Sequence, residues 1–186
     1  MRRLLLKNLV QGPLTEAAPA PDDAAIAELA SHVNQRARRR LGRTLAIREV
    51  DAGSCNGCEL EIHALANVLY DLERFGLRFV ASPRHADVLL VTGPVTRNMR
   101  EALDRTYRAT PDPKWVVAVG DCARNGGIFA GSDACLAGVS AVVPVDLHIP
   151  GCPPSPIEML QGLLALLDSV SADATRAPIS TRREKP

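Results

Sequence analysis

Three short apolar runs in this chain are each followed by a turn that carries cysteine. The first run precedes Gly53-Ser54-Cys55-Asn56-Gly57-Cys58, the second precedes Asp121-Cys122, and the third precedes Gly151-Cys152-Pro153-Pro154. Nearly continuous apolar runs that alternate with helical patterns are typical of a parallel sheet covered by helices on both faces. Ligand sites in such open sheets lie beyond the carboxyl ends of the strands. Four cysteines are therefore predicted to meet at one edge of a sheet.

The same periodicity predicts five strands and four helices. The strands are expected at 45–50, 77–80, 88–92, 115–119 and 142–145, and the helices at 24–40, 59–75, 96–108 and 156–167. The last helix has the clearest start, because Ser155 can cap it, Pro156 suits the first helical position and Glu158 completes a capping box. The segment 121–141 has no clear element and carries glycine turn signals, as functional loops often do. We predict a three-layer α/β/α fold with a mostly parallel sheet.

The chain divides into a basic N-terminal part, one domain and a tail. Its 186 residues suit a single domain of common size with extensions. Residues 1–43 carry eight Lys and Arg against four acidic residues, and we expect an extended arm followed by a basic amphipathic helix. Such a helix can dock on an acidic partner or an anionic membrane surface, although a solvated basic helix would show the same pattern. Residues 44–170 are expected to form the α/β domain and residues 171–186 a loose tail.

The location of the protein follows from its termini and its cysteines. No apolar stretch approaches the roughly 18–20 residues that span a bilayer. Residues 1–7 superficially resemble a twin-arginine export signal, but the apolar segment that should follow is interrupted by polar residues and Pro13. We expect a cytoplasmic protein, in which five cysteines serve as ligands or thiols rather than as disulfides. No nucleic-acid partner is expected.

The four cysteines at the strand ends have several chemical interpretations. Soft thiolate ligands are typical of iron–sulfur clusters, a proline after a cysteine ligand is common at such sites, and helix N-termini stabilise the anionic cluster. A zinc ion would accept the same four thiolates. Cys55 and Cys58 alone could form a thioredoxin-like redox pair, and the glycine-containing loop could bind phosphate, although it lacks a Walker lysine. Four buried structural thiols would need no cofactor at all.

Two further residues near this pattern are candidates for lesser roles. Cys135 has no obvious partner, and a free cysteine often behaves as a small apolar side chain. Glu61 lies three residues after Cys58, in the first turn of the expected helix, where an acid is favoured by the helix dipole. It could also support the cysteine ligands or take part in proton-coupled electron transfer.

Five sequence segments together resemble one known family. They are CNGCELE at 55–61, FVASPRHAD at 79–87, TGPVT at 92–96, GDC at 120–122, and VPVD at 143–146 with IPGCPP at 149–154. The chain resembles, over residues 45–167, the 20 kDa iron–sulfur subunit of respiratory NADH:quinone oxidoreductase and the small subunits of membrane-bound nickel–iron hydrogenases. Quinone-reducing complexes typically have two adjacent cysteines where this chain has Cys55 and Cys58. The spaced pair is similar to the small subunits of energy-converting hydrogenases and formate hydrogenlyase.

This resemblance implies a fold, a cofactor and partners. It implies a flavodoxin-like sheet and a single [4Fe–4S] cluster held by Cys55, Cys58, Cys122 and Cys152. It also implies a catalytic large subunit with a nickel–iron or quinone site, a ferredoxin-like iron–sulfur subunit and membrane-arm subunits. The complex would lie on the cytoplasmic side of the inner membrane, with this chain attached through its partners. The chain is thus expected to be an electron-transfer subunit of a hydrogenase-type complex. The alternatives are a quinone-proximal subunit and a zinc-stabilised interaction module.

Overall fold

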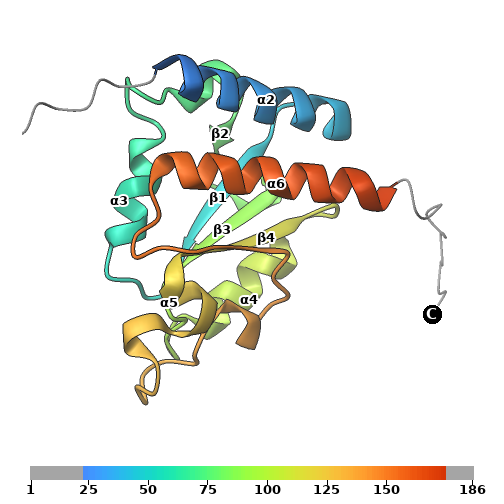
Figure 1. The fold of residues 1–186 in the computed structure, drawn as a ribbon. Helices are drawn as coiled ribbons and strands as arrows, with labels where there is room; N and C mark the ends of the chain where they lie inside the picture. The colour runs from blue at the N-terminus through green and yellow to red at the C-terminus, as the bar shows by residue number, and fades with distance from the viewer. Residues whose placement is uncertain (1–22, 175–186) are drawn as a thin grey trace, which may run out of the picture.

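The computed structural model describes residues 23–174, which form one parallel sheet covered by helices on both faces (Figure 1). The strands are β1 (Ala46–Asp51), β2 (Arg78–Phe79), β3 (Val88–Thr92), β4 (Trp115–Val119) and β5 (Leu147–Ile149). Their order in the sheet is β2-β1-β3-β4-β5, and every pair is parallel. This is the flavodoxin-like order, in which the strand order reverses between β1 and β3. The predicted three-layer α/β/α fold is confirmed.

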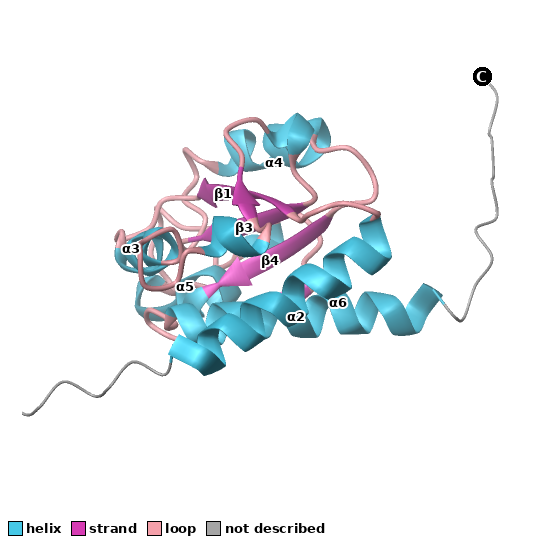
Figure 2. Cartoon of the chain, turned by 90° about the horizontal axis from the view of Figure 1, so that it is seen from above, coloured by secondary structure: helices cyan, strands magenta, loops and turns pink. Residues whose placement is uncertain are grey.

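Two groups of helices cover the two faces of the sheet (Figures 1 and 2). One face carries α2 (Asp23–Leu41), α3 (Gly57–Ala64) and α6 (Pro156–Ala174), and the other carries α4 (Arg100–Ala109) and α5 (Gly120–Asn125). The central strands β3 and β4 are buried along their whole length. That burial explains why their sequences are continuously apolar rather than alternating.

Helices α2 and α6 pack against each other and share one apolar core. Helix α2 buries Ile26, Ala30, Val33 and Ala37 in the core that it shares with α6. The apolar stripe of the predicted basic helix therefore packs within this chain, and the exposed Arg38 and Arg39 remain on its outer side.

The start of α6 forms as the sequence indicates. Ser155 Oγ accepts a hydrogen bond from the Glu158 backbone N–H at 3.4 Å, and the Glu158 carboxylate accepts one from the Ser155 backbone N–H at 2.7 Å. The predicted capping box is confirmed. The helix continues to Ala174, beyond the apolar periodicity that ends at Leu167.

The predicted helix over 59–75 is wrong. Helix α3 ends at Ala64, and a 3-10 turn follows at Leu72–Phe75. The backbone tightens after Ala64, where the N–H groups of residues 65–67 donate to carbonyls three residues earlier. Beyond this point the Asn67 side chain accepts the backbone N–H groups of Leu69 and Tyr70 at 2.8 and 3.1 Å, so the helix does not continue. Val68 and Leu69, which lie within the predicted helix, are 99% and 47% exposed.

Other boundaries also differ from the sequence prediction. The predicted strand over 142–145 is wrong: the fifth strand lies at Leu147–Ile149, after a 3-10 turn at Val139–Ala141. Asp146 positions it, because its side chain accepts the Val116 backbone N–H at 2.7 Å. The helix expected over 96–108 begins only at Arg100, and the segment 121–141 contains α5 and short 3-10 turns.

The structure describes neither terminus of the chain. The predicted arm over 1–22 lies outside the described residues. The predicted tail over 171–186 begins too early, because α6 continues to Ala174, and its remainder also lies outside the described residues. Within residues 23–174, no helix is long and apolar enough to cross a membrane.

Candidate metal centre

The four predicted cysteines come together at the carboxyl edge of the sheet. They line one cavity of about 90 Å³, formed by Ser54, Cys55, Gly57, Cys58, Gly93, Asp121, Cys122, Gly151, Cys152 and Pro153. These residues follow β1, β3, β4 and β5, which all end at this edge. Cys135 does not line the cavity; it lies half-buried opposite Thr96 in an isolated bridge. The ligand role of the four cysteines stays a prediction, but their convergence is a property of the fold.

The turn after β1 is shaped by side chains that hold the backbone. Asp51 at the end of β1 accepts the N–H groups of Gly53 and Ser54 at 2.7 and 2.8 Å. The Ser54 hydroxyl then accepts the N–H of Asn56 at 3.0 Å, and Asn56 adopts a left-handed conformation just before α3. Local hydrogen bonds of this kind are why Asp, Ser and Asn favour turns.

The turns after β4 and β5 are tied to each other. The Asp121 backbone N–H donates to the Gly151 carbonyl at 2.9 Å, and the Gly151 N–H donates to the Asp121 carboxylate at 3.2 Å. Cys122 and Cys152 each follow one of these residues directly. Two turns that are 30 residues apart in the sequence therefore carry their cysteines to one place.

Glycines pack closely against the cysteine turns, where a side chain would collide with a thiol or with the backbone. A Cβ atom on Gly120, whose φ is +86°, would lie 2.7 Å from Cys58 Sγ. A Cβ on Gly127 would lie 2.9 Å from Cys122 Sγ, and one on Gly93 would lie 2.7 Å from the Ser54 backbone nitrogen. The edge of the sheet is thus fitted closely around sulfur atoms, and this fits a group bound through thiolates.

The environment opposes charged thiolates when nothing positive is bound. Burial raises the pKa of the Cys58 thiol to about 12, and the neighbouring Glu59 carboxylate adds to this rise. The pKa of Cys122 is also raised, first by burial and then by Cys152 and Cys55, against the backbone N–H of Ile128, which lowers it. Metal cations would compensate this crowding of negative charge, since metal binding drives thiol deprotonation.

Sequence reasoning missed Glu59, which is the most unusual side chain near the cavity. Glu59 is only 5% exposed, and among the described residues neither of its carboxylate oxygens has a hydrogen-bond partner. The predicted Glu61 is half-exposed on the same helix. A signal was available: Glu59 precedes Ile62 by three residues, which places both on the buried side of α3.

A carboxylate and a histidine lie beside Glu59. Burial raises the pKa of Glu49 on β1, and the nearby His63 opposes the rise. His63 Nε2 lies 3.7 Å from Glu49 Oε2, and the His63 side chain is largely exposed. The described ion pairs do not include Glu59 itself.

The site differs from the geometry of a single metal ion. Within residues 23–174, no three His, Cys, Asp or Glu side chains converge closely enough to hold one ion. A structural zinc ion needs four ligand atoms at about 2.0–2.3 Å. The four thiols instead surround a cavity, as they would around a larger cofactor.

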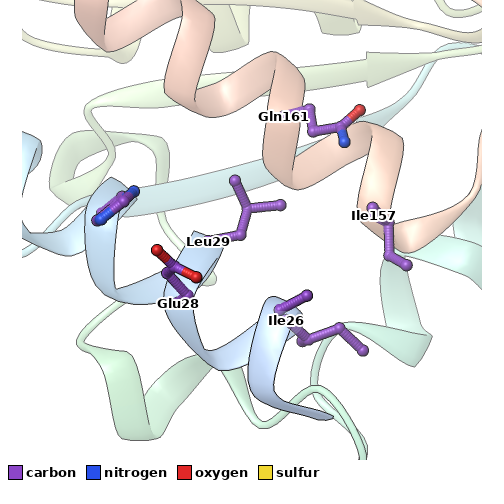
Figure 3. Close-up of a pocket in the computed structure, with 7 residues that line it drawn as sticks. Ile26, Glu28, Leu29, Ile157 and Gln161 are labelled. Carbon is purple, nitrogen blue, oxygen red and sulfur yellow. The ribbon is translucent and has the colours of Figure 1, made fainter. Parts of the chain in front are cut away.

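A second hollow lies away from the cysteines. It has a volume of about 370 Å³ and lies between α2 and the start of α6, where Ile26, Leu29 and Ile157 form its apolar part (Figure 3). Glu28 and Gln161 stand at its side. No cysteine lines it, so the chemistry expected from the cysteines does not belong to this hollow.

Comparison with known proteins identifies one family. The family model described as "NADH ubiquinone oxidoreductase, 20 Kd subunit" matches residues 55–166. The chain is 46% identical over 131 residues to a Pyrococcus furiosus protein named "Probable membrane-bound hydrogenase subunit mbhJ", covering 70% of this chain and 78% of that protein. It is also 46% identical over 129 residues to formate hydrogenlyase subunit 7 of Escherichia coli, covering 69% of this chain but only 51% of that protein.

A solved structure shows the same fold. A chain of the membrane-bound sulfane sulfur reductase, an archaeal respiratory membrane complex, matches with a TM-score of 0.63 and 34% identity. The match covers 76% of both chains.

Proposed function

The chain belongs to the family of the 20 kDa subunit of NADH ubiquinone oxidoreductase, and from this premise we propose that it transfers electrons in a membrane-associated nickel–iron hydrogenase-type complex. The family makes it an oxidoreductase subunit of a hydrogenase or NADH:quinone oxidoreductase-type complex. In the proposal it holds one [4Fe–4S] cluster through Cys55, Cys58, Cys122 and Cys152. It is not a catalyst by itself.

The observation that carries the proposal is the convergence of four thiols on one glycine-walled cavity. In a [4Fe–4S] cluster, each thiolate binds a different iron, so the thiolates stand around the cluster rather than around one atom. The spacing of the cysteines counts against the zinc-stabilised interaction module, because zinc folds usually pair two short Cys-x-x-Cys units and this chain has only the pair Cys55 and Cys58.

The residues around the cavity have definable tasks. The four cysteines would hold the cluster, which when bound supplies one-electron transfer. The Ile128 backbone N–H lowers the pKa of Cys122 by donating to its sulfur and would stabilise the thiolate there. The Asp121–Gly151 hydrogen bonds hold two of the cysteine turns at a constant separation.

Exposed apolar side chains flank the cysteines and support a docked partner. Leu60, two residues after Cys58, is 62% exposed, and Ile128 in the turn after α5 is 80% exposed. Cys55 and Cys152 are themselves exposed. We propose that a catalytic large subunit covers this edge, since it would bury the apolar side chains and shield the cluster from water. Electrons would pass between that subunit and a ferredoxin-like partner.

The hydrogenase branch is favoured by the cysteine spacing and by the relatives. Cys55 and Cys58 are separated by two residues, and two relatives at 46% identity bear the names of a membrane-bound hydrogenase subunit and a formate hydrogenlyase subunit. The second candidate is a quinone-proximal subunit, which the family description favours. Two Cys-x-x-Cys pairs in the large subunit would identify nickel–iron, and their absence would favour the quinone reductase.

We also propose a peripheral attachment to the cytoplasmic side of the inner membrane. The named relative and the matching solved structure belong to membrane-bound complexes. Membrane-arm subunits would then provide the attachment.

The proposal is tested on protein purified without oxygen. We expect a brown protein with about four irons per chain and a paramagnetic resonance signal of a reduced [4Fe–4S] cluster. A colourless protein that binds one zinc per chain and cannot be reconstituted with iron and sulfide under reducing conditions would overturn it.

A further inference from the structure

We propose that Glu59 lowers the reduction potential of the cluster by holding an unpaired, buried carboxylate beside the ligand Cys58. The inference rests on the proposed function, because it requires a redox cluster at the four cysteines. In this proposal Glu59 acts on the cluster through its charge and is not one of its ligands.

The first observation is that the Glu59 carboxylate is buried at a cost in free energy. It is 5% exposed, and both carboxylate oxygens are buried without a hydrogen-bond partner among the described residues. Buried carboxylates in proteins are normally paired or hydrogen-bonded, because an isolated buried charge loses its hydration. A buried polar group without a partner is often associated with a functional site.

The second observation is the charge that surrounds this carboxylate. Its packed neighbours include Glu49 on β1, another acid, and His63, whose imidazole lies 3.7 Å from Glu49. On the other side of the cavity, Asp121 stands next to Cys122 and uses its carboxylate to accept the Gly151 N–H. Arg48 also acts on Glu49, but the described ion pairs give Glu59 no cation as a partner.

The third observation is that Glu59 stands next to a cysteine of the cavity. It directly follows Cys58, which lines the cavity, and both residues lie in the first turn of α3. A negative charge at this place disfavours an electron added to a cluster bound there. The potential of an iron–sulfur cluster depends on its net charge and surroundings, and a buried charge is little screened by solvent. Glu59 therefore stabilises the oxidised state relative to the reduced one.

The consequence is a cluster whose reduction potential is lower than it would be without the Glu59 charge, which favours a more strongly reducing electron partner.

The test is a potential titration of the full chain with its cluster, followed by paramagnetic resonance. Glu59→Gln removes the charge and keeps the size of the side chain. We expect its potential to rise by about 59 mV or more, equivalent to a tenfold change in the equilibrium constant for one-electron reduction. Glu59→Asp keeps the charge and should stay near the wild-type potential.

Glu61→Gln is the matched control. It removes the same charge from the same helix, but from a half-exposed position. Its shift should be smaller and should vanish at 1 M salt, where the Debye length is about 3 Å, whereas the shift of Glu59→Gln should persist.

The inference fails if Glu59→Gln leaves the potential unchanged, or if its shift equals that of Glu61→Gln and disappears in salt. If Glu59→Gln and Glu59→Met both lose their iron while the wild type keeps it, Glu59 is required to hold the cluster and the inference also fails. A wild-type chain that cannot be loaded with iron would instead overturn the proposed function.

Discussion

The carboxyl edge of the sheet and the α2–α6 layer differ in backbone regularity and in packing. The cysteine edge consists of short turns, left-handed glycines, exposed thiols and an orphaned buried carboxylate. The α2–α6 layer consists of two 19-residue helices, a complete capping box and close apolar packing. The first region buries a carboxylate without a hydrogen-bond partner, and the second begins with a helix cap whose groups bond to each other.

This difference indicates that the cysteine edge serves the cofactor and that the α2–α6 layer stabilises the fold. Unsatisfied or strained groups persist at functional sites when the surrounding structure is stable enough to hold them. Substitutions at the cysteine edge should therefore change the bound cofactor, and substitutions in the α2–α6 layer should change stability and leave the cofactor in place.

The largest effect is expected from the cysteines of the cavity. Replacing Cys55, Cys58, Cys122 or Cys152 by serine exchanges a soft thiolate for a harder, less acidic hydroxyl, and each change should abolish or badly alter the cluster. Cys135→Ser, outside the cavity, should retain full iron content. Iron analysis and paramagnetic resonance on the five variants measure this, and iron loss in Cys135→Ser with retention in Cys55→Ser would contradict the ligand assignment.

A methyl group added next to the Cys58 thiol should remove most of the iron. In Gly120→Ala the new Cβ would lie 2.7 Å from Cys58 Sγ, so the sulfur must move. Gly131→Ala is the matched control, because Gly131 has a similar φ of +83° but nothing within 4 Å of the added Cβ. Both variants should be destabilised by backbone strain, and only Gly120→Ala should lose iron. Equal iron content would show that the wall tolerates the methyl group.

A cavity in the α2–α6 layer should affect stability instead. Leu163 is fully buried in the core, and Leu163→Ala should lower the free energy of unfolding by about 2–5 kcal/mol. Val68→Ala, at a position 99% exposed, should change it by less than about 0.5 kcal/mol. Urea unfolding measures both, and the folded Leu163→Ala protein should still bind its full iron. Loss of iron from that folded variant would show that the two regions are coupled.

The raised pKa of Cys58, about 12, predicts slow alkylation in iron-free protein. A raised pKa leaves only a small thiolate fraction below pH 12, and the thiolate is the reactive species. The alkylation rate at Cys58 should therefore increase about tenfold per pH unit between pH 8 and pH 10. Mass spectrometry of the Cys58 peptide follows the rate, and a plateau below pH 10 would show that the thiol is more acidic than its burial indicates.

The smallest effect is expected at the cap of α6. Ser155→Ala removes the hydroxyl that accepts the Glu158 N–H and should lower the free energy of unfolding by about 1 kcal/mol. Ser140→Ala, at an exposed position in a 3-10 turn, should change it by less than about 0.5 kcal/mol. Neither should alter iron content, and a change in iron for Ser155→Ala would link the cap to Cys152 three residues before it.

The sequence alone was sufficient for features that depend on local pattern. Continuous apolar runs predicted the parallel strands 88–92 and 115–119, and Ser155 with Glu158 predicted the start of α6. The convergence of the four cysteines also followed, since parallel strands end at one edge and each cysteine follows a strand. These inferences needed only the period of the chain and the direction of its strands.

The tertiary structure decided what depends on competition between groups. Apolar residues continue the helical period through Val68 and Leu69, but the backbone tightens after Ala64 and the Asn67 side chain then takes the N–H groups of Leu69 and Tyr70, so the helix does not continue. The fifth strand begins at Leu147 because Asp146 bonds to β4, which no local pattern reveals. The sequence spacing places Glu59 and Ile62 on one side of α3, but only the packing of α3 against the sheet decides that this side is buried.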